Sequence, residues 1–143
     1  MSRPQPHRLA DYRHTLEIPT RWGDNDAYGH VNNTIFYQWF DSAVNAWLVQ
    51  QGLLDIEDGD PIALVVETRC SYFEPLAFPD PVDVGLAIER LGRSSVRYRI
   101  GVFAVGADTA AAQGEFVHVL VDRTSRRPVE MPQSWRRALE AIS

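Results

Sequence analysis

Apolar residues recur at helical spacing along one long segment in the first third of the chain. Between Asn32 and Gln51 the apolar positions lie three, four, seven and eight residues apart, and they are Ile35, Phe36, Trp39, Phe40, Ala43, Val44, Trp47 and Leu48. This period predicts a helix with one broad buried face. Asn32 or Asn33 is a favourable N-cap residue, and Gly52 is a favourable residue just beyond the helix end. The sequence therefore predicts a long, largely buried helix.

Most other apolar segments alternate with a period of two, which is typical of strands. A first strand is expected over residues 14–21, where Pro19 indicates an edge position or a bulge. Four more strands are expected further on, over 62–73, 82–91, 95–105 and 113–123. A short amphipathic helix is expected over 134–142, with Trp135, Leu139 and Ile142 facing inward. One strand, a long helix and four strands in hairpin succession predict an α+β fold with an antiparallel sheet.

Composition restricts the possible functions. The 143 residues suit one domain, expected over 1–143 with a loose lead-in over 1–12. A formal net charge of −5 argues against a nucleic-acid-binding surface. No apolar segment approaches the length of a membrane span and the first residues lack a signal peptide, so a cytoplasmic protein without membrane contact is expected. The single cysteine, Cys70, excludes an internal disulfide and is expected to be a small core residue.

The richest candidate chemistry lies directly before the long helix, in Arg21-Trp22-Gly23-Asp24-Asn25-Asp26-Ala27-Tyr28-Gly29-His30-Val31-Asn32-Asn33. A carboxylate beside the free N–H groups of a helix N-terminus suits a reaction in which negative charge develops on oxygen. Asp26 is expected to act as a nucleophile or as a general base on water. The alternative for Asp26 is an Asx turn that shapes the loop. Asp24 is expected instead to brace the turn or an arginine such as Arg21.

Other residues near this segment have two interpretations each. His30 either orients a substrate and handles a proton, or hydrogen-bonds the backbone of the turn. Gly29 is expected to supply a backbone conformation that a side chain would block. Tyr37 and Asp41 lie four residues apart on one helix face and are candidates for lining a pocket together. The four histidines are scattered without ligand spacing, so no metal site is predicted.

The pattern Asp24-x-Asp26-x-x-Gly29-His30-Val31-Asn32-Asn33, followed by Tyr37 and Asp41, resembles the signature of hotdog-fold acyl-CoA thioesterases of the 4-hydroxybenzoyl-CoA thioesterase type. The segment Arg90-Leu91-Gly92-Arg93-Ser94-Ser95 is similar to the connection between the third and fourth strands of that family. The resemblance covers Thr15 to Ile142. It implies a hotdog fold, in which a five-stranded antiparallel sheet wraps around the long helix. It also implies a homodimer, commonly a homotetramer, with active sites at the dimer interface.

The resemblance also implies roles for individual residues. Asp26 corresponds to the catalytic carboxylate, and the backbone N–H near Asn33 to the group that polarises the thioester carbonyl. Tyr28, in the same turn, is a further substrate-binding candidate. Contacts to the nucleotide of CoA are expected at Arg93, Ser94, Ser95, Arg126 and Arg127, because arginine forks onto phosphate oxygens and serine donates to them. Apart from CoA as part of the substrate, no cofactor is implied.

Alternatives exist for the arginines and for the function as a whole. The alternative for Arg93 is a solvated hairpin tip, and the alternative for Arg126 and Arg127 is a position beside a turn. A hydratase or dehydratase acting on acyl thioesters would also use Asp26 and His30, although the continuation into Val31-Asn32-Asn33 favours a thioesterase. A non-catalytic acyl-CoA-binding protein would keep the arginines but would not need a carboxylate at position 26. The sequence leaves open the acyl group and the choice between CoA and acyl carrier protein.

Overall fold

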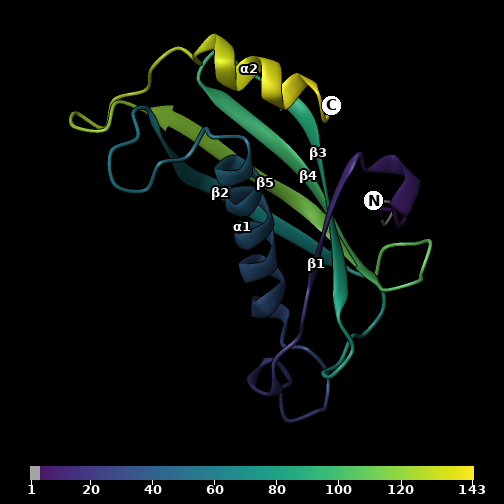
Figure 1. Ribbon diagram of the computed structural model, residues 1–143. Helices are drawn as coiled ribbons and strands as arrows, with labels where there is room; N and C mark the ends of the chain where they lie inside the picture. Colours follow the sequence, from purple (N-terminus) through teal and green to yellow (C-terminus); the bar gives the residue numbers. More distant parts are fainter. Residues whose placement is uncertain (1–3) are drawn as a thin grey trace.

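A curved five-stranded sheet partly encloses one long helix in the computed structural model, which describes residues 4–143 (Figure 1). The elements are β1 (His14–Ile18), α1 (Asn33–Gln50), β2 (Ile62–Tyr72), β3 (Val82–Leu91), β4 (Ser95–Ala104), β5 (Ala112–Val121) and α2 (Gln133–Glu140). The strand order is β1-β3-β4-β5-β2, and every neighbouring pair is antiparallel. The expected α+β hotdog fold is therefore confirmed.

Helix α1 forms where the apolar period predicted it. Asn32 is the N-cap residue, and its side-chain oxygen accepts hydrogen bonds from the N–H (2.9 Å) and the hydroxyl (2.7 Å) of Thr34. Beyond Gln50 the chain turns at Gly52, which has a φ of +71°. All eight apolar residues of the periodic face are buried. The strong cap fixes where the helix begins, and the buried face fixes its orientation against the sheet.

The core lies between α1 and the inner face of the sheet. Alternate residues of the three central strands belong to this core, namely Val82, Val84, Leu86, Ile88, Val96, Tyr98, Ile100, Val102, Ala112, Phe116 and Leu120. From α2 and the residues after it, Trp135, Leu139 and Ile142 pack against the same cluster, as expected. Cys70 is half-buried beside it, and burial raises the pKa of its thiol to about 11. A thiol with so high a pKa is a poor nucleophile, which agrees with the expected core role.

Strands β1 and β2 form the two edges of the sheet. Strand β1 ends at Ile18, because Pro19 has no N–H to continue the ladder, and within residues 4–143 it pairs only with β3. Strand β2 forms the other edge and pairs with β5 through a register shift between Val65 and Glu67. Strand β5 ends two residues earlier than expected. There Asp122 accepts hydrogen bonds from two following N–H groups and turns the chain.

The outer face of the sheet, away from α1, is covered in part by the N-terminal segment. A loose lead-in was expected over 1–12, of which residues 1–3 lie outside the described residues. From His7 onward this expectation is corrected: the His7 N–H donates to the side chain of Gln113 (2.6 Å), and the Leu9 N–H donates to a carbonyl of the loop before β5 (2.9 Å). The backbone of this segment is therefore hydrogen-bonded to the body of the fold.

Tyr12 anchors the same segment on the outer face. It is buried and lies over Gly85 and Gly101, which are directly paired across β3 and β4. A Cβ added at Gly85 or Gly101 would come within 2.6 or 2.9 Å of the Tyr12 side chain. The paired glycines thus leave the space that the ring fills. The Tyr12 hydroxyl lies 2.8 Å from Nδ1 of His7.

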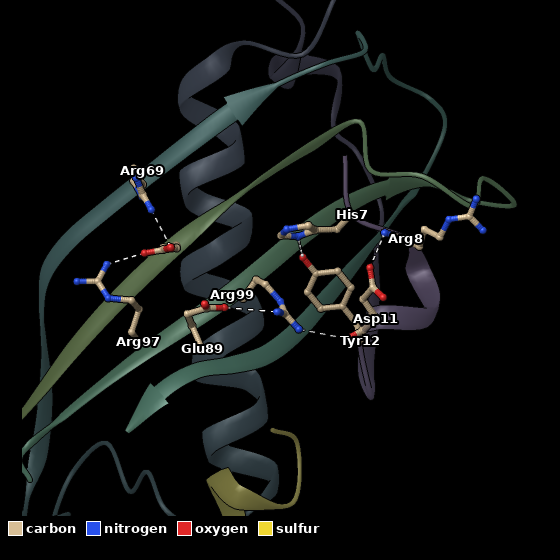
Figure 2. A network of polar contacts seen from close by, with 9 residues as sticks. His7, Arg8, Asp11, Tyr12, Arg69, Glu89, Arg97 and Arg99 are labelled. Atoms are coloured by element: carbon tan, nitrogen blue, oxygen red, sulfur yellow. Dashed lines mark hydrogen bonds and ion pairs between the residues drawn. The ribbon is translucent and has the colours of Figure 1, made fainter. Parts of the chain in front are cut away.

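Beside Tyr12, the outer face has a network of charged side chains (Figure 2). Glu115 of β5 is bonded to Arg69 of β2 (2.7 Å) and to Arg97 of β4. Arg99 of β4 lies 3.4 Å from Glu89 of β3. We call these five residues the outer-face network. Its charges are distributed over four neighbouring strands and are largely paired with one another.

Candidate active site

Two carboxylates shape the segment before α1, and the first of them is deeply buried. Asp24 is 1% exposed and accepts hydrogen bonds from the backbone N–H (2.8 Å) and the Nε (3.0 Å) of Arg21. This confirms the expectation that Asp24 braces Arg21. The backbone carbonyl of Asp24 also accepts the N–H of Asn32 (2.8 Å). The brace therefore fixes the N-cap of α1 as well as the turn.

Asp26 is half-buried in the turn itself. One oxygen of its carboxylate accepts the N–H of Tyr28 (2.8 Å), which is the Asx turn named above as its alternative role. The Asp26 N–H donates to the carbonyl of His30 (2.8 Å). Within residues 4–143 the second carboxylate oxygen has no hydrogen-bond partner. Asp26 thus shapes the turn with one oxygen and keeps the other available for a reactant.

Gly29 and Tyr28 complete the turn. Gly29 has a φ of +81°, in the left-handed region that glycine enters at little cost, so the expected backbone role is confirmed. An antiparallel bridge between Asn25 and Val31 closes the loop around them. Tyr28 is 88% exposed, and its ring points away from the core. The turn therefore presents Asp26 from a rigid backbone and Tyr28 to solvent.

A cavity of about 250 Å³ opens at the N-terminus of α1. It is lined by His30, Val31, Asn33, Phe36, Tyr72, Phe73, Glu74, Pro75 and Leu76. Asn33 is the first residue of α1, and its N–H has no acceptor among residues 4–143, as is usual for the first N–H groups of a helix. The next N–H, from Thr34, is already bonded to Asn32. Asn33 is therefore a residue of the cavity lining whose N–H is a free donor.

His30 lies between this cavity and a second hollow of about 310 Å³. Pro75 and Leu76 line both, so they separate the two spaces together with His30. His30 is exposed, and within the described chain its ring makes no hydrogen bond, while its carbonyl serves the turn. The imidazole is therefore free to meet a ligand in either space.

Tyr37 and Asp41 follow on α1 but do not line the 250 Å³ cavity of the single chain. Tyr37 is half-buried and packs edge-to-face on Phe40, with 6.1 Å between ring centroids. Asp41 is exposed, and one carboxylate oxygen accepts from the side chain of Asn45 (3.1 Å). Their common role as pocket residues stays a prediction.

The arginines expected to bind phosphate belong to the β3–β4 hairpin and the turn after β5, and these segments lie at the opposite end of α1 from the motif turn (Figure 1). Arg93 and Ser94 are in the β3–β4 hairpin, where the Arg93 carbonyl accepts the N–H of Met131 (2.8 Å), in the segment just before α2. Arg126 and Arg127 are exposed in the turn after β5. Among the described residues, the guanidinium groups of these three arginines have no hydrogen bond or ion pair. Ser95, at the start of β4, is half-buried.

Tyr72 is among the cavity residues that the sequence did not single out. Tyr72 ends β2, its hydroxyl donates to the carbonyl of Asn33 (2.9 Å), and its ring meets Phe36 edge-to-face at 5.1 Å. The alternating pattern predicted a strand here but could not indicate which residue would reach the helix start. That depends on the pairing of β2 with β5, which brings distant segments together.

Two features of residues 4–143 bear on other functions. No group of three or more His, Cys, Asp and Glu side chains is arranged there to hold a metal ion. None of the helices there has both the length and the apolarity needed to cross a membrane.

Comparisons with known proteins agree with this fold. The model of the thioesterase-like superfamily matches residues 20–139. Among solved structures, the PA5185 protein from Pseudomonas aeruginosa is 49% identical, with a TM-score of 0.94 and 97% of each chain covered. A thioesterase from Thermus thermophilus, crystallised with coenzyme A and Zn, is 30% identical, with a TM-score of 0.78 over 93% of this chain and 96% of that one.

A more distant structure shows that the fold is shared widely. The 1,4-dihydroxy-2-naphthoyl-CoA thioesterase from Synechocystis is 22% identical, with a TM-score of 0.78 over 87% of this chain and 93% of that chain. Among curated proteins, none matches this chain.

Proposed function

Because this chain belongs to the thioesterase-like superfamily, we propose that it hydrolyses acyl-CoA thioesters to a free acid and CoA beside the N-terminus of α1. One observation carries the proposal. The free N–H of Asn33 borders a cavity, and Asp26, which keeps one carboxylate oxygen unpaired, belongs to the turn that leads into that helix. The CoA bound to the relative from Thermus thermophilus supports CoA as the carrier.

The N-terminus of α1 stabilises the negative charge that develops on the substrate. As a nucleophile adds to the thioester carbon, negative charge builds on the carbonyl oxygen, and the Asn33 N–H donates to it. The positive end of the α1 dipole acts in the same direction. The loss of one such donor typically costs about 2.7–4 kcal/mol of transition-state stabilisation. A backbone donor needs no side-chain ordering, so it is already oriented when the substrate arrives.

Asp26 either activates a water as the nucleophile or is itself the nucleophile. As a general base, its free oxygen takes a proton from water, the oxygen of that water bonds to the thioester carbon, and the C–S bond breaks. As a nucleophile, the carboxylate oxygen bonds to the carbon, the thiolate leaves, and water hydrolyses the mixed anhydride. In both routes the thiolate takes a proton to become free CoA.

The test is release of free thiol from short, long and aromatic acyl-CoAs by the wild type and the Asp26→Asn variant. The asparagine oxygen can still accept the Tyr28 N–H, so the turn should persist while kcat falls about 10²–10⁴-fold. Asp108→Asn, an exposed aspartate in the loop before β5, is the matched control and should keep full activity.

Other outcomes would redirect the proposal. Activity that survives Asp26→Asn would overturn the aspartate mechanism. If no CoA ester were hydrolysed, acyl carrier protein thioesters would be assayed next. Hydration of an enoyl-CoA without thiol release would instead identify a hydratase. Binding of acyl-CoA without any turnover would identify a binding protein.

The active unit is proposed to be a homodimer joined along β2. This strand is an edge of the sheet: one backbone side pairs with β5, and among residues 4–143 no strand lies beside the other side of residues 62–71. The strand exposes Val65 (47%), Val66 (60%) and Tyr72 (36%). Ile56, in the loop just before it, is 76% exposed. A free edge with adjoining apolar side chains is a favourable place for pairing with a second copy. A homotetramer would need a further interface, and sedimentation would give the oligomeric state.

The position of the arginines supports an antiparallel arrangement of the two copies. Helix α1 has 18 residues and is therefore about 27 Å long at a rise of about 1.5 Å per residue. The motif turn lies at one end of the helix, and the β3–β4 hairpin and the turn after β5, which contain the three arginines, lie toward the other (Figure 1). Antiparallel pairing along β2 would bring the arginine end of one copy beside the motif end of the other. One substrate would then use the carboxylate of one chain and the arginines of its partner.

Mixing two inactive variants tests this sharing directly. Asp26→Asn and the double variant Arg126→Glu, Arg127→Glu should each be weak alone. If the site is shared, each mixed dimer contains one intact site, so random reassociation should restore roughly a quarter of wild-type activity. If the carboxylate and the arginines serve a site on the same chain, mixing should restore none.

A further inference from the structure

Tyr72 connects the edge of the sheet to the first residue of α1. Its hydroxyl donates to the carbonyl of Asn33 (2.9 Å), and the N–H of the same residue is the free donor at the cavity. Its ring packs on Phe36, one turn further into the helix, at an interplanar angle of 89°. Tyr72 therefore contacts the helix start at two points, one polar and one apolar.

The other end of this connection is anchored in the sheet. Tyr72 is paired with Ala112 in β5, and the N–H groups of Phe73 and Glu74, which follow it, both donate to the carbonyl of Ala111 (2.8 and 3.0 Å). The backbone of Tyr72 is thus fixed on both sides by the sheet. A phenol on such a backbone is a rigid strut, because it has only two side-chain torsions.

The first residue of α1 needs a contact that fixes its position. The first residue of a helix has no intrahelical bond from its own N–H, and helix ends fray more readily than helix centres. An oxyanion donor must nevertheless lie within a fraction of an ångström of its best position, since a misplacement of about 1 Å can reduce the rate by about 10²-fold. Asn32 caps Thr34, but its side chain does not hold the Asn33 carbonyl.

We propose that Tyr72 is a positioning residue, which holds Asn33 so that its N–H meets the thioester carbonyl oxygen in the correct place. This inference rests on the proposed function, since it acts through the Asn33 donor. The ring of Tyr72 also forms one wall of the cavity, so its hydroxyl and its ring have separable roles.

The protonation of Tyr72 agrees with a donor role. Burial, with Cys70 and Tyr37 nearby, raises the pKa of Tyr72 above its ordinary value. The phenol therefore keeps its proton throughout the neutral range and continues to donate to the carbonyl.

The test compares Tyr72→Phe, which removes only the hydroxyl, with Tyr72→Leu, which also removes the ring. For Tyr72→Phe we expect kcat to fall about tenfold, with KM within about twofold of the wild type. For Tyr72→Leu we expect the same loss in kcat together with a higher KM, because a wall of the cavity is lost. Tyr12→Phe is the matched control: it removes a hydroxyl that also has a partner at 2.8 Å, but on the outer face, and it should leave kcat unchanged.

A second readout does not depend on turnover. Amide hydrogen exchange in the first turn of α1, over residues 35–37, should become faster in Tyr72→Phe and not in Tyr12→Phe, at an unchanged melting temperature. Wild-type kcat in Tyr72→Phe, or a rise in KM alone, would overturn the positioning role while leaving the proposed function intact. Unchanged exchange in the first turn would also overturn it. An inactive wild type would overturn the proposed function itself.

Discussion

The motif turn and the outer-face network contain similar residue types and differ in how those residues are paired. In the outer-face network, Glu115 has two arginine partners, and Arg99 lies beside a glutamate (Figure 2). At the motif turn, one carboxylate oxygen of Asp26 has no partner within the described chain. The N–H of Asn33, at the start of α1, has no acceptor there either. A dense group of charges that neutralise one another stabilises a surface, whereas accessible groups without partners are available to a ligand.

Groups without hydrogen-bond partners differ in whether a substrate can reach them. The Nδ1 of His118 and the hydroxyl of Tyr98 are likewise without hydrogen-bond partners in residues 4–143, but both residues are buried in the core under α1. An unpaired group there destabilises the fold instead of meeting a substrate. A group is therefore available to a ligand only if it lacks a partner and can also be reached from solvent or from a cavity.

The largest effect on stability is expected from His118. Burial lowers its pKa to about 4, whereas in the unfolded chain it titrates near 6.5. The unfolded state therefore binds an extra proton between these values. Stability is full above pH 6.5 and falls by roughly 3 kcal/mol as the pH drops to 4. In His118→Gln the urea midpoint should depend much less on pH over this window. An equal dependence in both proteins would contradict the assignment.

A smaller effect is expected from the buried carboxylate at the motif turn. Asp24→Ala removes two hydrogen bonds from Arg21 and should lower the free energy of unfolding by about 2 kcal/mol. It should also lower kcat, because the turn that leads into α1 would be less well fixed. Urea denaturation and thiol release measure the two effects. The exposed variant Asp108→Ala should show neither, and a stable but inactive Asp24→Ala would point to a direct catalytic role.

The N-cap of α1 should matter less for stability than Asp24. Asn32→Ala removes the acceptor for two groups of Thr34 and should cost about 1 kcal/mol. Asn32→Asp keeps an acceptor at the cap and should retain most of that stability. Thermal unfolding of the two variants side by side measures the difference. Equal melting temperatures would mean that the cap contributes little here.

The smallest effect is expected from the outer-face network, despite its many charges. Burial alone would raise the pKa of Glu115, but hydrogen bonds from Arg69 and Arg97 lower it below its ordinary value. Its stabilisation is therefore present above about pH 4.5 and is lost as the pH falls through the lower folded pKa. Glu115→Gln should cost at most about 1 kcal/mol at neutral pH, less at high salt, and leave kcat unchanged. A loss of activity in this variant would show that the two regions are coupled.

Periodicity carried most of the information about the fold. The eight apolar residues of α1 and the alternating residues of the strands are local patterns. They predict the elements correctly because one face of each element is buried in the structure. The brace of Arg21 by Asp24 and the turn at Gly29 were also readable, since their partners lie within a few residues. The role of Asp26 in catalysis stays a prediction.

What the sequence did not reveal depends on contacts between distant segments. Tyr72 meets Asn33 across 39 positions, and Tyr12 rests on two glycines far along the chain. Proline-rich composition predicted a loose start, but composition does not report a buried tyrosine or the glutamine side chain that accepts the N–H of His7. Only the strand pairing of the whole sheet determines these contacts.

The strand order has a consequence for how the chain folds. Strand β5 comes last in the sequence but lies between β4 and β2. During synthesis, β1, β3 and β4 can pair in turn, while β2 must wait until β5 has emerged from the ribosome. Until then β2 has no neighbouring strand, and the apolar face of α1 is only partly covered. Such late, long-range closure slows folding and exposes apolar surface to aggregation, so the growing chain is most vulnerable in the interval before its final strand is complete.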